Sequence, residues 1–178
     1  QIESPEDALF YVVSKSGGTA ETVANFAIAK NFLLDKGISE KELNEYFVFC
    51  TDQEKGHLRE LANSDNFKTL EVPNDLGGRF SVLSPVGFLP AMFASINCEK
   101  LVEGALNISS EINSQKEKHS LFKLGSHLAY LATEKAPSVN QTVLMPYSSK
   151  LKNLSHWFVQ LWGESLGKYS KDQNKNVG

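Results

Sequence analysis

The chain has 178 residues, and its 18 lysines and arginines against 21 aspartates and glutamates give a formal net charge of −3. Hydrophobic residues make up 41% and charged residues 22%, which is ordinary for a globular protein and excludes a disordered or low-complexity chain. The mild acidity, with a pI of about 5.8, argues against nucleic acid as the main partner.

The first part of the chain alternates apolar runs with helical patterns. Residues 8–13 form a continuous apolar run, as expected of a strand buried on both faces. A helical pattern follows and stops at Gly37, and further strands are expected at 46–50 and 67–72, with a short helix at 57–62 between them. Strands that alternate with helices predict a parallel sheet covered by helices.

Beyond residue 84 the pattern is mostly helical. Polar breaks separate helices up to about residue 135, including a long one near 119–134. A further strand is expected at 142–145, and a helix with one apolar stripe at 149–164. The polar, lysine-rich segment after Gly167 predicts a loose tail or linker.

Several classes of segment and site are not predicted. The longest nearly apolar run, residues 86–96, is shorter than the ~20 residues that span a bilayer. Residues 1–5 are polar and acidic and do not predict a signal peptide. Cys50 and Cys98 lack the spacing of a zinc site, so we expect two buried free thiols, although a disulfide stays open.

The first candidate site is the segment Ser14–Thr19, which joins a predicted strand to a predicted helix. It contains three hydroxyl groups, one lysine and two glycines. Exposed N–H groups and the helix dipole attract an anion there, glycines allow close approach, and lysine supplies charge. The segment predicts phosphate binding but does not match a Walker A loop; the alternative is an N-cap, at Gly18 or Thr19, followed by a flexible turn.

The second candidate is Arg79, one of only two arginines, which follows the pair Gly77-Gly78. Two glycines would let the backbone turn sharply and project the guanidinium from a defined place. Such a cation could bind a carboxylate or stabilise an oxyanion formed during a reaction. The alternative is a surface turn with a solvated arginine.

The third candidate is the pair Gln160 and Glu164, four residues apart and therefore on one helix face. Glu164 could act as a base, especially if Trp162 excludes water and raises the pKa of the carboxyl. The alternative is an ordinary solvated glutamate. His156 lies on the same face, but no second ligand adjoins it, so no metal site is predicted.

Together these segments resemble the glucose-6-phosphate isomerase (phosphoglucose isomerase) family. Four motifs occur in the family's order and cover the chain from about Leu9 to Lys168. They are Ser-Lys-Ser-Gly-Gly-Thr-Ala-Glu-Thr at 14–22, Gly-Gly-Arg-Phe-Ser at 77–81, Met-Pro-Tyr at 145–147, and Gln-x-x-x-Glu-Ser-x-Gly-Lys at 160–168. The first also suits other sugar-isomerase (SIS) domains, whereas the second and fourth are more specific.

The resemblance implies a role for each matching residue. Glu164 matches the base that moves a proton between C1 and C2, Arg79 the group that stabilises the enediolate oxygen, and Gln160 a substrate-binding position. The positions that match the phosphate-binding loop are Ser14, Lys15, Ser16, Gly17, Gly18 and Thr19. None of the four histidines, His57, His119, His127 and His156, sits in a matching motif.

The resemblance also implies the wider biology. The family interconverts glucose 6-phosphate and fructose 6-phosphate in cytoplasmic glycolysis and gluconeogenesis, without a metal or organic cofactor, and its members are usually homodimers. The expected partner is therefore a sugar phosphate, with no nucleic acid and no membrane. The runner-up function is a phosphosugar-binding SIS module without catalysis, and a third possibility is a structural fragment with vestigial motifs.

The implied fold is α/β, with SIS-type parallel sheets flanked by helices, and incomplete. Residues 1–97 would form the later part of a first SIS domain, 98–136 a helical connection, and 137–178 the start of a second SIS domain. The family's ring-opening histidine and C-terminal lysine are expected beyond Gly178. We therefore expect the segment alone to be inactive and poorly stable.

Overall fold

The structure is a computed structural model that describes residues 2, 4–131 and 141–166. Internal contacts divide the chain into two compact units, Gln1–Ile96 and Asn97–Gly178. The first unit is α/β and the second, where described, is helical. The predicted α/β class with a small parallel sheet flanked by helices is confirmed, whereas the division into parts of two SIS domains stays a prediction.

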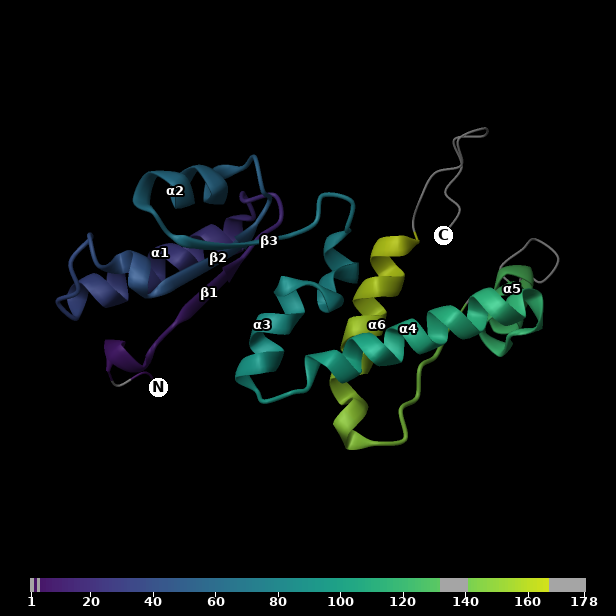
Figure 1. The fold of residues 1–178 in the computed structure, drawn as a ribbon. Helices are drawn as coiled ribbons and strands as arrows, with labels where there is room; N and C mark the ends of the chain where they lie inside the picture. Colours follow the sequence, from purple (N-terminus) through teal and green to yellow (C-terminus); the bar gives the residue numbers. More distant parts are fainter. Residues whose placement is uncertain (1, 3, 132–140, 167–178) are drawn as a thin grey trace. The chain divides into compact units, whose positions relative to one another are not determined.

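Strands and helices alternate in the first unit, as predicted (Figure 1). They are β1 (Phe10–Val13), α1 (Ala20–Asp35), β2 (Phe47–Thr51), α2 (His57–Asp65), β3 (Lys68–Glu71) and α3 (Pro85–Phe93). Three 3₁₀ helices complete the unit: η1 (Pro5–Asp7), η2 (Leu43–Glu45) and η3 (Gly78–Leu83). The three strands and the two helices between them fall within a few residues of their expected ranges.

The sheet is parallel, in the order β1-β2-β3. Crossovers between parallel strands are right-handed in nearly all proteins, so two consecutive crossovers in one direction place both helices on one face. The core agrees, because Leu33 of α1 and Leu58 of α2 belong to the same buried cluster as Phe49 of β2. One face of the sheet is thus covered by α1 and α2.

Aromatic side chains fill this covered face. The ring of Phe26 on α1 lies 5.0 Å from that of Phe47, 5.2 Å from that of Phe49 and 6.1 Å from that of Phe67, each near-perpendicular. Edge-to-face pairs of this kind add about 0.5–1.5 kcal/mol each beyond the burial of apolar area. The cluster fixes α1 against the sheet and so fixes the loop that precedes α1.

The second face of the sheet is less well covered. Val12 points into the core and is buried, but its neighbours Tyr11 and Val13 are only half-buried, as are Val48 and Leu70. The expected burial of the first strand on both faces is therefore wrong. The reason is topological: both crossover helices lie on the opposite face.

The second unit consists of helices. They are α4 (Cys98–Gln115), η4 (Lys116–Lys118), α5 (Ser120–Leu131), η5 (Ser149–Leu151) and α6 (Lys152–Ser165). The helix expected at 119–134 is confirmed as far as Leu131, and its last residues lie outside the described part. The helix expected at 149–164 is confirmed as η5 and α6.

The strand expected at 142–145 is wrong, because the structure has no strand there. A strand forms by pairing with a neighbouring strand, and residues 97–131 and 141–166 contain no strand that could be its partner.

His119 is a buried polar residue of the second unit, and its Nδ1 accepts a hydrogen bond from the backbone N–H of Leu121 at the start of α5. No apolar side chain is buried in residues 97–131 and 141–166.

Candidate active site

The segment Ser14–Thr19 follows the carboxyl end of β1 and leads into α1, the position where α/β sheets commonly bind ligands. The hydroxyls of Ser14 and Thr19 lie 2.8 Å apart in a hydrogen bond that closes the segment. Thr19 is the N-cap of α1, which agrees with the predicted cap at Gly18 or Thr19. Its side chain makes no capping hydrogen bond. The loop therefore precedes the N-terminus of α1, where the expected phosphate binding stays a prediction.

Two glycines bring this loop against the N-terminus of α2. Gly17 has a φ of +69°, and a Cβ placed on it would lie 2.9 Å from the nitrogen of Leu58 and 3.0 Å from that of His57. Gly56, the N-cap of α2, has a φ of +102°, and its Cβ would lie 2.5 Å from the carbonyl oxygen of Ser16. Only glycine combines these φ values with so close an approach.

Lys15 does not point freely into solvent. Its ammonium donates hydrogen bonds to the carbonyl oxygens of Asn74, at 2.9 Å, and Leu76, at 2.7 Å. Its own carbonyl accepts a hydrogen bond from the N–H of Asp52 at 3.2 Å. The lysine expected to supply charge to a phosphate is thus also bonded to the segment that leads to Arg79.

Arg79 is the second residue of η3 and is half-buried. Its guanidinium lies over the ring of Phe80, with Cζ 4.7 Å from the ring centroid. Neither Gly77 nor Gly78 has a positive φ, so the path of the chain before Arg79 does not use a backbone conformation that only glycine favours. Instead Gly77 is the N-cap of η3 and Gly78 its first residue.

Sequence reasoning missed Asp52, which directly follows β2 and is buried beside the loop. Its carboxylate accepts hydrogen bonds from the backbone N–H groups of Glu54, at 2.9 Å, and Lys55, at 3.2 Å. The pKa of Asp52 is held below its usual value, mainly by the hydrogen bond from Glu54. The hydrogen bond from Lys55 and the positive charges of Lys55 and Lys15 lower it further. An aspartate directly after a buried strand was the available signal.

Sequence reasoning also missed Tyr11 on β1. Its hydroxyl donates a hydrogen bond to the carbonyl oxygen of Pro85 at 2.8 Å, so it joins β1 to the start of α3. Burial, and then a hydrogen bond with Cys50, raise the pKa of the Tyr11 phenol, while burial raises that of the Cys50 thiol. Tyr11 therefore stays a neutral hydrogen-bond donor at physiological pH.

Gln160 and Glu164 lie on α6 in the second unit, on one helix face as predicted. The side-chain amide of Gln160 donates to Oε1 of Glu164 at 2.9 Å. Both side chains are exposed, and Trp162 stacks on Phe158, with ring centroids 5.5 Å apart. The shielding of Glu164 by Trp162 that the sequence suggested is not found.

The described residues contain no group of three or more histidine, cysteine, aspartate or glutamate side chains arranged to hold a metal ion. Neither cysteine is in a disulfide; Cys50 is buried as expected, but Cys98 is only half-buried. Among these residues no helix is both long and apolar enough to cross a membrane.

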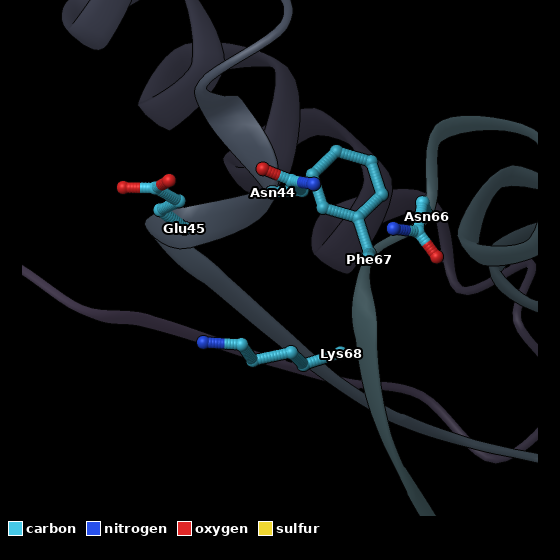
Figure 2. Close-up of a pocket in the computed structure, with 5 residues that line it drawn as sticks. All are labelled: Asn44, Glu45, Asn66, Phe67 and Lys68. Carbon is cyan, nitrogen blue, oxygen red and sulfur yellow. The ribbon is translucent and has the colours of Figure 1, made fainter.

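A pocket in the first unit lies away from the predicted site (Figure 2). It is lined by residues at the amino ends of β2 and β3, namely Asn44, Glu45, Asn66, Phe67 and Lys68. The loop Ser14–Thr19 follows the carboxyl end of β1, at the opposite edge of the same parallel sheet. The pocket contains none of the predicted site residues.

The first unit is thus an α/β unit whose loop Ser14–Thr19 lies at the carboxyl edge of its parallel sheet. The model of the phosphoglucose isomerase family matches residues 2–178, and the chain belongs to this family. The resemblance drawn from the four motifs is confirmed.

Relatives in sequence and structure support the same assignment. The chain is 41% identical over 170 residues to the glucose-6-phosphate isomerase of Rubrobacter xylanophilus and 38% identical over 177 residues to that of Carboxydothermus hydrogenoformans. These matches cover 96% and 99% of this chain but only 39% and 37% of the relatives. The chain therefore spans well under half the length of these relatives.

Two crystal structures are similar over 98% of this chain. One is a hypothetical protein from Thermus thermophilus, with a TM-score of 0.86 and 36% identity, of which this chain covers 40%. The other is a glucose-6-phosphate isomerase from Chlamydia trachomatis, with a TM-score of 0.80 and 28% identity, of which it covers 33%.

Proposed function

We propose that the protein containing this chain interconverts glucose 6-phosphate and fructose 6-phosphate. The observation that carries the proposal is the family match over residues 2–178, together with relatives named glucose-6-phosphate isomerase at 38–41% identity. The site motifs of the chain supply the groups that such an aldose–ketose isomerisation requires.

The reaction needs a base that removes a proton from one carbon and returns it to its neighbour. Glu164 serves as this base, and the amide of Gln160, bonded to its Oε1 at 2.9 Å, fixes the orientation of the carboxylate. A carboxylate can carry the proton between C1 and C2 because it is basic in one step and acidic in the next.

Negative charge develops on the substrate oxygen in the enediolate. The Arg79 guanidinium stabilises this charge, since a fixed cation beside the developing negative charge lowers the energy of the enediolate. Stacking on Phe80 limits the orientations of this side chain. No cofactor is required for these steps.

The phosphate lies away from the reacting carbons and anchors the substrate. The N-terminus of α1 and the hydroxyls of Ser14, Ser16 and Thr19 bind it, with Gly17 and Gly18 allowing the backbone N–H groups to approach. Binding at a distance from the reaction orients the reacting carbons.

We also propose that the complete protein acts as a cytoplasmic homodimer, as the family does. Light scattering coupled to size exclusion measures the mass in solution. A mass of twice that of the complete chain supports the dimer, and a monomer contradicts it.

A coupled assay for glucose 6-phosphate formation from fructose 6-phosphate tests the function. It is run on the complete protein with a verified intact mass, beside Glu164→Gln and the control Glu103→Gln, which removes an exposed carboxylate from α4. We expect turnover in the wild type and control and a loss of about 10²–10⁴-fold in Glu164→Gln, with substrate binding retained.

The non-catalytic alternative gives a different result. A phosphosugar-binding module would bind glucose 6-phosphate without converting it, and Glu164→Gln would change nothing that is measured. Absence of turnover in the complete wild-type protein would overturn the proposal.

A further inference from the structure

Two parts of the proposed site, some 60 residues apart in sequence, are joined by one side chain. The Lys15 ammonium lies 2.9 Å from the carbonyl oxygen of Asn74 and 2.7 Å from that of Leu76. Lys15 belongs to the loop Ser14–Thr19, whereas both carbonyls lie between β3 and η3. Hydrogen bonds from a charged donor at these distances are roughly twice as strong as neutral ones.

The two carbonyls belong to residues that precede Arg79 by five and three positions. Leu76 is followed by Gly77, the N-cap of η3, and Arg79 is the second residue of that helix. The N–H of Phe80 donates to the carbonyl of Gly77 at 2.9 Å, so the first turn of η3 continues directly from the residues that Lys15 holds. The Lys15 contacts thus lie on the segment that leads into the helix carrying Arg79.

The segment that follows η3 is also hydrogen-bonded, in this case to a side chain of β1. Tyr11, four residues before Lys15, donates to the carbonyl oxygen of Pro85 just beyond η3. Side chains from β1 and from the loop that follows it therefore hold η3 at both ends. Of these two side chains, only Lys15 belongs to the loop Ser14–Thr19, because Tyr11 lies on β1.

The backbone of Lys15 is also held in place by hydrogen bonds. Its carbonyl accepts from the N–H of Asp52, and its neighbour Ser14 donates a backbone hydrogen bond to the carbonyl of Cys50 at 3.0 Å. Both contacts attach the lysine backbone to the end of β2. The side chain thus extends from an immobilised backbone to the Arg79 segment.

We infer that Lys15 is a positioning residue, whose ammonium sets the distance between the phosphate loop and Arg79 by holding the carbonyls of Asn74 and Leu76. The inference rests on the proposed function, since phosphate and enediolate belong to one substrate molecule and must fit both sites at once. Misplacement of about 1 Å in such an arrangement can reduce a rate about 10²-fold.

This differs from the role that sequence suggests for Lys15, which is a charge for the phosphate. A phosphate ligand acts on affinity, so its loss would raise KM and weaken inhibition by inorganic phosphate. A positioning residue acts on the placement of Arg79, so its loss lowers kcat.

The test uses the complete protein with Lys15→Arg, Lys15→Met and the control Lys68→Met. Arginine keeps the charge but cannot place one nitrogen between the two carbonyls as lysine does. Lys68 is exposed at the amino end of β3, so Lys68→Met removes the same charge at the opposite edge of the sheet.

We expect Lys15→Arg to keep the inhibition constant for inorganic phosphate near the wild-type value, while kcat falls by about 10- to 100-fold. Lys15→Met lowers kcat at least as far, and Lys68→Met matches the wild type. An unchanged kcat in Lys15→Arg, or a change confined to KM and phosphate inhibition in both variants, would overturn the inference.

Hydrogen exchange provides a readout that does not depend on turnover. Inorganic phosphate should slow exchange of the amides of residues 77–81 in the wild type but not in Lys15→Met, while protection of β2 stays the same in both. Equal protection of residues 77–81 by phosphate in Lys15→Met would contradict the coupling. An inactive wild type that still shows this coupling would overturn only the proposed function.

Discussion

The backbones of Gly17 and Leu58 are so close that a Cβ on Gly17 would lie 2.9 Å from the Leu58 nitrogen. Leu58 is fully buried in α2, so it has no room to move away. The loop Ser14–Thr19 and the N-terminus of α2 are therefore packed closely against each other.

Gly17→Ala should destabilise the protein. The substitution forces a left-handed φ on a residue with a side chain and places its Cβ against the backbone of α2, which together cost about 1–3 kcal/mol of unfolding free energy. Chemical denaturation of the complete protein measures the change.

Gly18→Ala is the matched control for this prediction. Gly18 has no positive φ, and a Cβ on it would meet no atom within 4 Å. We expect its unfolding free energy to stay near that of the wild type. Equal losses in the two variants would show that the close approach of Gly17 to α2 does not determine stability.

Asp52→Asn should change the dependence of stability on pH. The pKa of Asp52 is lowered in the folded protein, so the carboxylate stabilises the fold above its ordinary pKa of about 4, and this contribution is lost as pH falls through the lower folded value. Asparagine keeps a carbonyl acceptor for the N–H groups of Glu54 and Lys55 but carries no charge.

Thermal midpoints measured between neutral and strongly acidic pH test this. We expect the wild type to exceed Asp52→Asn at neutral pH and the difference to shrink below about pH 4. Asp65→Asn, at an exposed position at the end of α2, serves as the control. A difference that stays constant with pH would contradict a role for the Asp52 charge.

The isolated 178-residue chain should lack turnover and should unfold without a single cooperative transition. Its first unit has an aromatic core, whereas α4, α5 and α6 bury no apolar side chain in the described residues. Helices depend mainly on the burial of an apolar face for their stability.

Hydrogen exchange on the isolated chain resolves the two units. Amides of β1, β2 and β3 should be protected, and those of α4–α6 should exchange rapidly. Equal protection in both units, or measurable isomerase turnover from this length of chain, would contradict the prediction.

The fold of the first unit follows from local patterns in the sequence. The apolar runs of β1, β2 and β3 and the helical spacing between them each depend on neighbouring residues, and the parallel topology follows from their alternation. The strand expected at 142–145 shows the limit, because an apolar run forms a strand only where a partner strand is present.

The site could be predicted as a set of residue types but not as a set of contacts. The motifs place Lys15, Arg79 and Glu164, and their proposed chemical roles remain to be tested. The bonds from Lys15 to Asn74 and Leu76 span 59 and 61 residues, so no local spacing could indicate them.

The roles of the glycines likewise could not be predicted from local sequence. Gly77 and Gly78 precede Arg79 but do not adopt a positive φ, whereas Gly17 does and lies against α2. Close approach between backbones depends on tertiary packing, which residue identity alone does not specify.

Deuterium incorporation tests the proposed role of Glu164 most directly. The complete protein is supplied with fructose 6-phosphate in D₂O, and deuterium at C2 of the glucose 6-phosphate formed is followed for the wild type and Glu164→Gln. A carboxylate base that exchanges its proton with solvent labels C2, so we expect labelling in the wild type and a rate lower by about 10²-fold or more in the variant. Equal labelling rates and equal turnover in both proteins would contradict proton transfer by Glu164.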